Sequence, residues 1–113
     1  MFKKENRLRK QKDFDRVFKK GKSSFDKTLG VKIRANSLGL NRFGVVVGSK
    51  VSKKAVKRNR IKRQIREAAK LYDQKQREGK DVLIIALPGA ADKDFADFKK
   101  SLDHHFNKLN VFS

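Results

Sequence analysis

The chain has 113 residues, which is enough for one compact domain and too few for two. Its 31 lysines and arginines against 12 acidic residues give a formal charge of +19, and such self-repulsion destabilises a compact state unless a polyanion lies nearby. There is no cysteine for disulfides or thiolate metal sites, and the longest apolar run, residues 82–87, is too short to span a bilayer. Residues 1–7 lack the apolar segment of a signal peptide. We therefore expect a cytoplasmic protein that works beside RNA or DNA.

A short amphipathic helix is predicted over residues 10–20. Phe14, Val17 and Phe18 lie at positions i, i+3 and i+4, and Gly21 follows as a helix stop. Two phenylalanines four residues apart on a helix are often core residues. They can also form an exposed aromatic pair for binding, and both interpretations stay open for Phe14 and Phe18.

Three strands are expected next. Residues 23–25 predict a short strand, followed by a turn at residues 26–27. Residues 28–35 alternate between apolar and polar side chains, which is typical of a half-buried strand. After a polar turn over residues 36–41, residues 42–48 contain three consecutive valines, which indicates a strand in the interior of a sheet.

A long basic helix is predicted from about Ser52, its expected N-cap, to the mid-seventies. Within residues 49–70, ten of 22 residues are Lys or Arg and only Glu67 is acidic. At about 100° per residue, one face of this helix is apolar and packs inward; it comprises Ile61, Ile65, Ala68 and Tyr72. The opposite face comprises Asn59, Arg63, Arg66 and Lys70. A solvated helix face normally mixes charges of both signs, so this one favours a polyanionic partner.

The last elements are a buried strand over residues 81–87 and a helix that starts near Asp92 or Asp94. Either aspartate is a suitable helix N-cap. The expected apolar stripe of this helix comprises Phe95, Phe98, Leu102, Phe106 and Leu109. The predicted order is thus α-β-β-β-α-β-α, a single α/β (α+β) domain over residues 1–113 built as a two-layer sandwich.

Sites of autonomous chemistry are poorly supported. Residues 44–50 lack the spacing of a phosphate-binding P-loop. His104 and His105 are adjacent on a helix and point about 100° apart, so they cannot chelate one ion as an i, i+4 pair does. Three aspartates near residues 92–97 are explained by helix capping more simply than by a metal site. We therefore expect no catalytic residue and no protein-held metal.

The basic helix also resembles a known family signature. Residues 55–67, Ala-Val-Lys-Arg-Asn-Arg-Ile-Lys-Arg-Gln-Ile-Arg-Glu, are similar to the Arg-Asn-Arg signature of the bacterial ribonuclease P protein component. Residues 7–21, with Phe-x-x-Val-Phe and a closing Gly, resemble the first helix of that family. The strand at residues 82–86 and the last helix follow in the same order, so the resemblance covers nearly the whole chain.

The resemblance implies an RNA-binding subunit of the ribonucleoprotein that removes the 5′ leader of precursor tRNA. The partners would be the catalytic RNA, in a 1:1 complex, and precursor tRNA, with Mg²⁺ and the chemistry belonging to the RNA. It also implies a four-stranded sheet with a left-handed βαβ crossover. A ribosomal or other structural RNA-binding protein is the alternative, and a protein-only metal-dependent nuclease is a third possibility.

Two sets of site residues follow from the resemblance. The RNA-binding set on the basic helix comprises Lys53, Lys54, Arg58, Asn59, Arg60, Lys62, Arg63, Arg66 and Lys70. The set expected in a leader-binding cleft between the first helix and the sheet comprises Lys10, Lys12, Phe14, Phe18 and Lys32. Family members often carry an aromatic residue where this chain has Lys32, so we expect a phosphate contact there in place of stacking.

Overall fold

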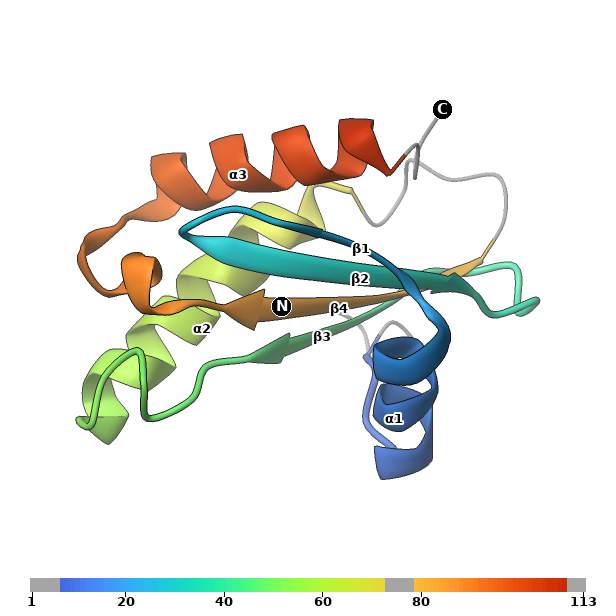
Figure 1. Ribbon diagram of the computed structural model, residues 1–113, viewed down its shortest axis with the longest axis horizontal. Helices are drawn as coiled ribbons and strands as arrows, with labels where there is room; N and C mark the ends of the chain where they lie inside the picture. Colours follow the sequence, from blue (N-terminus) through green and yellow to red (C-terminus); the bar gives the residue numbers. More distant parts are fainter. Residues whose placement is uncertain (1–6, 73–78, 110–113) are drawn as a thin grey trace.

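A four-stranded sheet with three α-helices forms the fold (Figure 1). The computed structural model describes residues 7–72 and 79–109. Its elements are α1 (Gln11–Lys20), β1 (Lys22–Phe25), β2 (Leu29–Ala35), β3 (Arg42–Val46), α2 (Ala55–Lys70), β4 (Lys80–Ala86), the short 3-10 helix η2 (Pro88–Asp92) and α3 (Phe95–Lys108). The predicted element order is confirmed, with η2 as an addition. Across the described ranges, no helix is long and apolar enough to cross a membrane.

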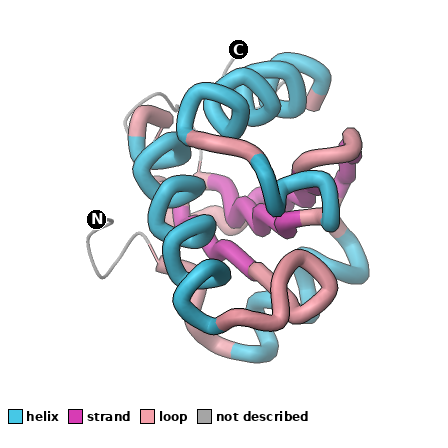
Figure 2. Tube along the Cα trace, turned by 90° about the vertical axis from the view of Figure 1, so that its left-hand side faces the viewer, coloured by secondary structure: helices cyan, strands magenta, loops and turns pink. Residues whose placement is uncertain are grey.

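The sheet has the strand order β1-β2-β4-β3. β2 pairs antiparallel with both β1 and β4, whereas β3 pairs parallel with β4. In Figure 1 both parallel strands, β3 and β4, point left, and β4 lies above β3. Between them the chain passes through α2, which lies behind the sheet in Figure 1 and to the left of the strands in Figure 2. This path is left-handed, as the resemblance implied, although about 98% of such crossovers are right-handed.

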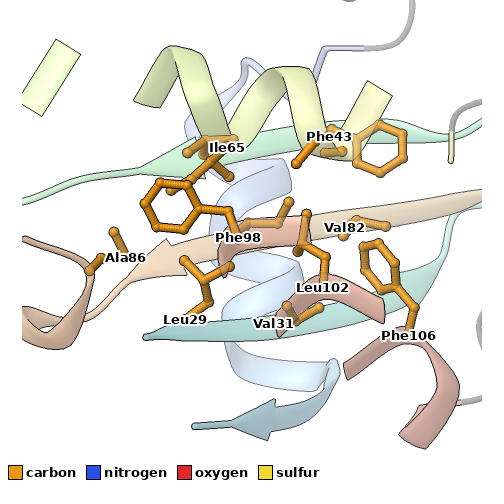
Figure 3. Packing of buried hydrophobic residues seen from close by; sticks show 14 of the residues in the cluster. Leu29, Val31, Phe43, Ile65, Val82, Ala86, Phe98, Leu102 and Phe106 are labelled. Carbon is orange, nitrogen blue, oxygen red and sulfur yellow. The ribbon is translucent and has the colours of Figure 1, made fainter. Parts of the chain in front are cut away.

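The main core lies between one face of the sheet and the helices α2 and α3. Alternate residues of β2 and β4 point toward this face, and Val31 is paired with Ile84. Phe98 and Leu102 of α3 are fully buried against these strands, next to Ile65 of α2 (Figure 3). This arrangement confirms the predicted sandwich of helices on a sheet.

The opposite face of the sheet is covered only in part, by α1. Leu8 and Val17 pack there against Leu83 of β4, with Phe14 and Ile85 partly buried at the edge of this small cluster. Because α1 is only ten residues long, much of this face stays open. Any binding surface on the sheet therefore lies on the α1 side.

The position of β3 corrects one prediction. The three valines indicated an interior strand ending at residue 48, but β3 ends at Val46 and lies at the edge of the sheet. Val45 is buried, whereas Val46 points to the open face and is 41% exposed. A strand with a continuous apolar run is buried on both sides only where both faces of the sheet are covered. Here α1 does not cover the part of the sheet that carries Val46.

The start of α2 corrects another. Lys54, not Ser52, is the N-cap residue, and its side chain makes no capping hydrogen bond. The Ser52 hydroxyl instead accepts a hydrogen bond from the Lys54 backbone N–H at 3.2 Å. Ser52 therefore stabilises the turn that precedes the helix and does not satisfy an N–H group inside it.

The stripe of α3 was predicted with one error. Asp94 is the N-cap and forms a capping box with Asp97, so the helix begins at Phe95. That residue lies on the first turn and is 40% exposed, whereas His105 and Ser101 are buried. The burial of Ser101 was not predicted, because an apolar count cannot recognise a polar residue whose partner lies elsewhere in the fold.

His105 joins α3 to the β1–β2 hairpin. Its Nε2 lies 3.0 Å from the Leu29 carbonyl oxygen and its Nδ1 lies 2.7 Å from the Ser24 hydroxyl. Because a carbonyl can only accept, Nε2 carries the proton and Nδ1 accepts from Ser24. Nε2 also lies 3.2 Å from the Asp26 carboxylate. Burial lowers the pKa of His105, and the Asp26 charge opposes this effect only in part.

This lowered pKa predicts acid sensitivity. The unfolded chain takes up the proton first, at a pKa of about 6.5, so the free energy of unfolding should fall as the pH drops below that value. Urea unfolding between pH 8 and pH 5 measures the slope. His105→Gln should flatten it, whereas His104→Gln should change it much less, because His104 is exposed and its charge is only a minor cause of the lowered pKa of His105. Equal slopes for His105→Gln and the wild type would show that His105 is not the cause of the acid sensitivity.

Candidate nucleic-acid interface

The buried stripe of α2 fixes which of its residues face outward. Ile61, Ile65 and Ala68 are fully buried, as predicted, and Tyr72 is nearly so. These contacts set the rotation of the helix, which exposes Asn59, Arg60, Arg63 and Lys70 and leaves Arg58, Lys62 and Arg66 partly buried at the edges. Lys53 and Lys54 are also exposed, but they precede the first residue of α2. The outward face of α2 is therefore a basic surface held by a rigid core.

The first turn of α2 is unusual for a helix. It contains no acidic residue, and Arg58 lies in it although cations are unfavourable near a helix N-terminus. The Arg58 guanidinium folds back, and its Nη1 donates a hydrogen bond to the Ser52 carbonyl oxygen at 3.0 Å. Arg58 thus has a structural contact as well as a place on the basic surface.

A cavity of about 330 Å³ gathers cations from two distant segments. Leu8 N–H donates to the Phe43 carbonyl at 2.9 Å, so residues 7–9 lie along the free edge of β3. Arg7 and Arg9 then face Lys62 and Arg66 of α2 across this cavity, which we call the arm pocket. Burial, and next the charge of Arg66, lower the pKa of Lys62. An anion in the arm pocket would relieve this repulsion.

A second cavity, of about 420 Å³, separates α1 from the open face of the sheet. It is lined by Gln11, Phe14, Asp15, Phe18, Val46, Leu83 and Ile85. We call it the α1 cleft. Its walls are mainly apolar and aromatic, and it is open to solvent along the side where Val46 and Phe18 are exposed.

The two phenylalanines of α1 have different environments. Phe14 is half-buried, and its ring fills the space above Gly44, where an added Cβ would come within 2.7 Å of it. Phe14 also lines the arm pocket, so it forms a wall between the two cavities. Phe18 is 55% exposed and offers its ring to solvent. Phe14 is thus chiefly a packing residue, and Phe18 is the free aromatic surface.

Lys32 lies beside Phe18. Its Nζ is 4.4 Å from the centroid of the Phe18 ring and donates a hydrogen bond to the Phe18 carbonyl oxygen at 3.1 Å. β2 therefore places a cation against the exposed aromatic surface of α1, as the grouping of Phe18 with Lys32 anticipated.

Lys10 and Lys12 lie elsewhere. They line a third cavity with Arg16, Arg34 and Arg42, on the other side of α1. The reason is helical geometry, because Lys12 and Arg16 are two residues from Phe14 and Phe18 and so about 200° away around the helix. The residues grouped in one predicted cleft thus belong to two separate surfaces.

An ion-pair cluster holds α1 in place over the sheet. Arg42 of β3 donates to both carboxylate oxygens of Asp81, at 2.8 and 2.7 Å, and its Nη1 lies 3.4 Å from Asp13 of α1. The hydrogen bonds with Asp81 raise the pKa of Arg42 above its ordinary value. Asn36 also donates to Asp81 at 2.9 Å. The cluster fixes the N-terminal half of α1, and with it the α1 cleft.

Sequence reasoning missed Arg7 and Arg9 as partners of α2. They lie more than 50 residues from Lys62 and Arg66, and no periodic pattern connects the two segments. The alternation Arg7-Leu8-Arg9, with only Leu8 buried, is the available signal, because it is typical of a strand-like segment.

Comparisons with known proteins agree on one family. The family model for Ribonuclease P matches residues 2–110. The ribonuclease P protein component of Clostridium botulinum is 38% identical over 111 residues, covering 97% of this chain and 99% of that protein. The solved RNase P protein of Staphylococcus aureus has a TM-score of 0.85 at 34% identity, covering 96% of this chain and 98% of that one. The Thermotoga maritima protein has a TM-score of 0.75 at 32% identity, with 91% and 94% covered.

Removal of Asp81 tests the ion-pair cluster. Asp81→Asn should lower the free energy of unfolding by about 3 kcal/mol, because it leaves the partly buried Arg42 without its main partner. Asp103→Asn is the matched control: its pair with Lys99 is exposed, so the loss should be about 0.3 kcal/mol. Urea unfolding measures both, and similar losses for the two variants would show that the cluster contributes no more stability than an exposed ion pair.

Proposed function

The chain belongs to the bacterial ribonuclease P protein family and is a subunit of this tRNA-processing ribonuclease, and we propose that its two cavities divide the work of binding RNA. The basic surface of α2, with the arm pocket, binds the catalytic RNA. The α1 cleft binds the single-stranded 5′ leader of precursor tRNA. The observation that carries this proposal is the adjacency of the two cavities, which share Phe14 as a wall.

The basic surface suits a folded RNA. Exposed arginines such as Arg60 and Arg63 can grip phosphates through two parallel hydrogen bonds, and Asn59, next to Arg60 and one turn before Arg63, can reach a ribose or a base edge. The arm pocket would take a phosphate where Arg7 and Arg9 face Lys62 and Arg66. Positive charge on this scale also lowers the cost of bringing precursor tRNA to a polyanionic RNA.

The α1 cleft suits a single strand. Aromatic rings stack on unpaired bases without preference for sequence, and nearby lysines follow the phosphates. Phe18 provides the exposed ring and Lys32 the cation. Lys10 and Lys12, on the other side of α1, would contact phosphates outside the cleft.

We assign Mg²⁺ and the chemical step to the RNA subunit. Among residues 7–72 and 79–109, no group of three or more His, Asp or Glu side chains could hold a metal ion. In this proposal the protein contributes binding and positioning. We also propose a cytoplasmic location, a single functional unit over residues 1–113, and one protein per catalytic RNA.

Family membership disfavours the alternative of a ribosomal RNA-binding protein. The deciding experiment is cleavage of precursor tRNA by a bacterial ribonuclease P RNA at low Mg²⁺, with and without this protein. The protein should increase the cleavage rate, and should do so more for a substrate with a long leader than for one with a single leader nucleotide. No stimulation would overturn the proposal, and cleavage by the protein without RNA would favour a protein-only nuclease.

Arg63→Gln should weaken binding to the catalytic RNA and reduce the slope of log affinity against log salt by about one, since one phosphate contact is lost. Arg63→Lys keeps the charge, so it should recover the slope without recovering all of the affinity. Lys100→Gln, an equal loss of charge on exposed α3, is the control and should leave both nearly unchanged. An identical effect of Arg63→Gln and Lys100→Gln would show that only net charge matters.

A further inference from the structure

A second exposed aromatic ring lies near the α1 cleft. Phe25 of β1 is 50% exposed, about as much as Phe18, although phenylalanine is usually buried. Its ring lies directly on Gly30 of β2, and a Cβ at that position would collide with it. Gly30 thus provides the space that the Cδ1–Cε1 edge of the Phe25 ring occupies.

The ring of Phe25 continues the floor of the cleft. The strand register aligns Phe25 with Gly30, Gly30 with Ile85, and Ile85 with Val46, across the full width of the sheet. All four residues belong to the face that carries α1, since the neighbouring row, including Val31 and Ile84, is buried under α2 and α3. Ile85 and Val46 already line the α1 cleft. The apolar floor therefore extends beyond the cavity as far as the edge strand β1.

Lys32 lies between the two exposed rings. Its Nζ is 4.4 Å from the centroid of the Phe18 ring and 5.8 Å from that of the Phe25 ring. An ammonium group has three protons, and the hydrogen bond to the Phe18 carbonyl uses one of them. The cation can therefore donate to a further acceptor while both rings keep an open face.

The surroundings of the two rings favour an anion. Residues 19–32 include five lysines and a single acidic residue, Asp26. Asp15 also lines the α1 cleft, and its carboxylate accepts a hydrogen bond from the Gln11 side chain at 2.9 Å. The carboxylate of Asp26 accepts hydrogen bonds from the Thr28 and Leu29 N–H groups and from the Ser101 hydroxyl. Burial alone would raise the pKa of Asp26, but these hydrogen bonds outweigh it and lower the pKa, so the carboxylate is engaged within the fold.

We propose that Phe18, Lys32 and Phe25 bind one dinucleotide step of single-stranded RNA. One base stacks on each ring, and the phosphate between them binds the Lys32 ammonium. Phe25 is thereby a second stacking residue of the leader-binding surface, and the path of the strand runs from the α1 cleft across β2 to β1. This inference rests on the proposed function and adds a residue and a direction to it.

The test compares substitutions of Phe25 in the full-length protein assembled with a bacterial ribonuclease P RNA. Phe25→Leu keeps an apolar cover over Gly30 and removes the ring, whereas Phe25→Tyr keeps the ring. Phe95→Leu, at a ring of similar exposure on α3, is the matched control. The measured quantity is the ratio of the dissociation constants for mature tRNA and for precursor tRNA with a long leader.

Phe25→Leu should reduce this ratio about tenfold, within the range expected for one lost base stack, and Phe25→Tyr and Phe95→Leu should keep the wild-type ratio. The effect should disappear when the leader is shortened nucleotide by nucleotide until it no longer reaches β1. If Phe25→Leu fails to fold, Lys32→Gln tests the same unit, and it should lower the salt dependence of binding for the long leader alone.

Two outcomes separate the inference from the proposed function. If Phe18→Leu reduces the ratio and Phe25→Leu does not, Phe25 only shields the β2 backbone; the inference is then overturned and the leader cleft stands. If the wild-type complex binds precursor and mature tRNA equally, the leader cleft itself is wrong and Phe25 has no role in it. An equal effect of Phe25→Leu at every leader length would also overturn the inference.

Discussion

The two buried faces of β4 determine the rest of this structure. β4 is hydrogen-bonded to β2 on one side and to β3 on the other, so it cannot move without breaking the sheet. Val82 and Ile84 hold α2 and α3 on one face, and Leu83 and Ile85 meet α1 on the other. Because α2 is fixed through its apolar stripe, its basic face has to point away from the sheet. Because α1 is short, the remaining area of the other face stays open.

The distribution of acidic residues explains how a chain of charge +19 keeps a strong positive field at its surface. Several of its carboxylates are occupied inside the fold. Asp13 and Asp81 pair with Arg42, Asp26 accepts from Ser101 and two backbone N–H groups, and Asp94 caps α3. These residues stabilise the connections between elements, where a carboxylate has a local partner. They do not neutralise the exposed arginines of α2, so the field there remains available for a phosphate backbone.

Local patterns in the sequence were sufficient to predict the elements and the buried stripe of α2, because helix and strand periodicities depend on neighbours a few residues away. Features that depend on distant residues were not predictable in the same way. The edge position of β3 follows from pairing order, and the burial of His105 follows from partners on β1 and β2. The arm pocket unites segments that share no pattern. The resemblance grouped Lys10 and Lys12 with Phe14, but both lysines line the third cavity. Helical rotation places Lys12 about 200° from Phe14, and Lys10 is the N-cap residue that precedes the helix.

The shared wall at Phe14 has a consequence for how the two surfaces would act together. Its ring sits over Gly44 and touches both the arm pocket and the α1 cleft, so a phosphate bound near Arg66 and a base bound near Phe18 would contact opposite sides of one rigid group. A catalytic RNA bound in the arm pocket would then hold residues 7–9 and α1 in the position that keeps the α1 cleft open. In that arrangement the proposed site for the leader and the proposed site for the catalytic RNA would be linked by direct packing through Phe14.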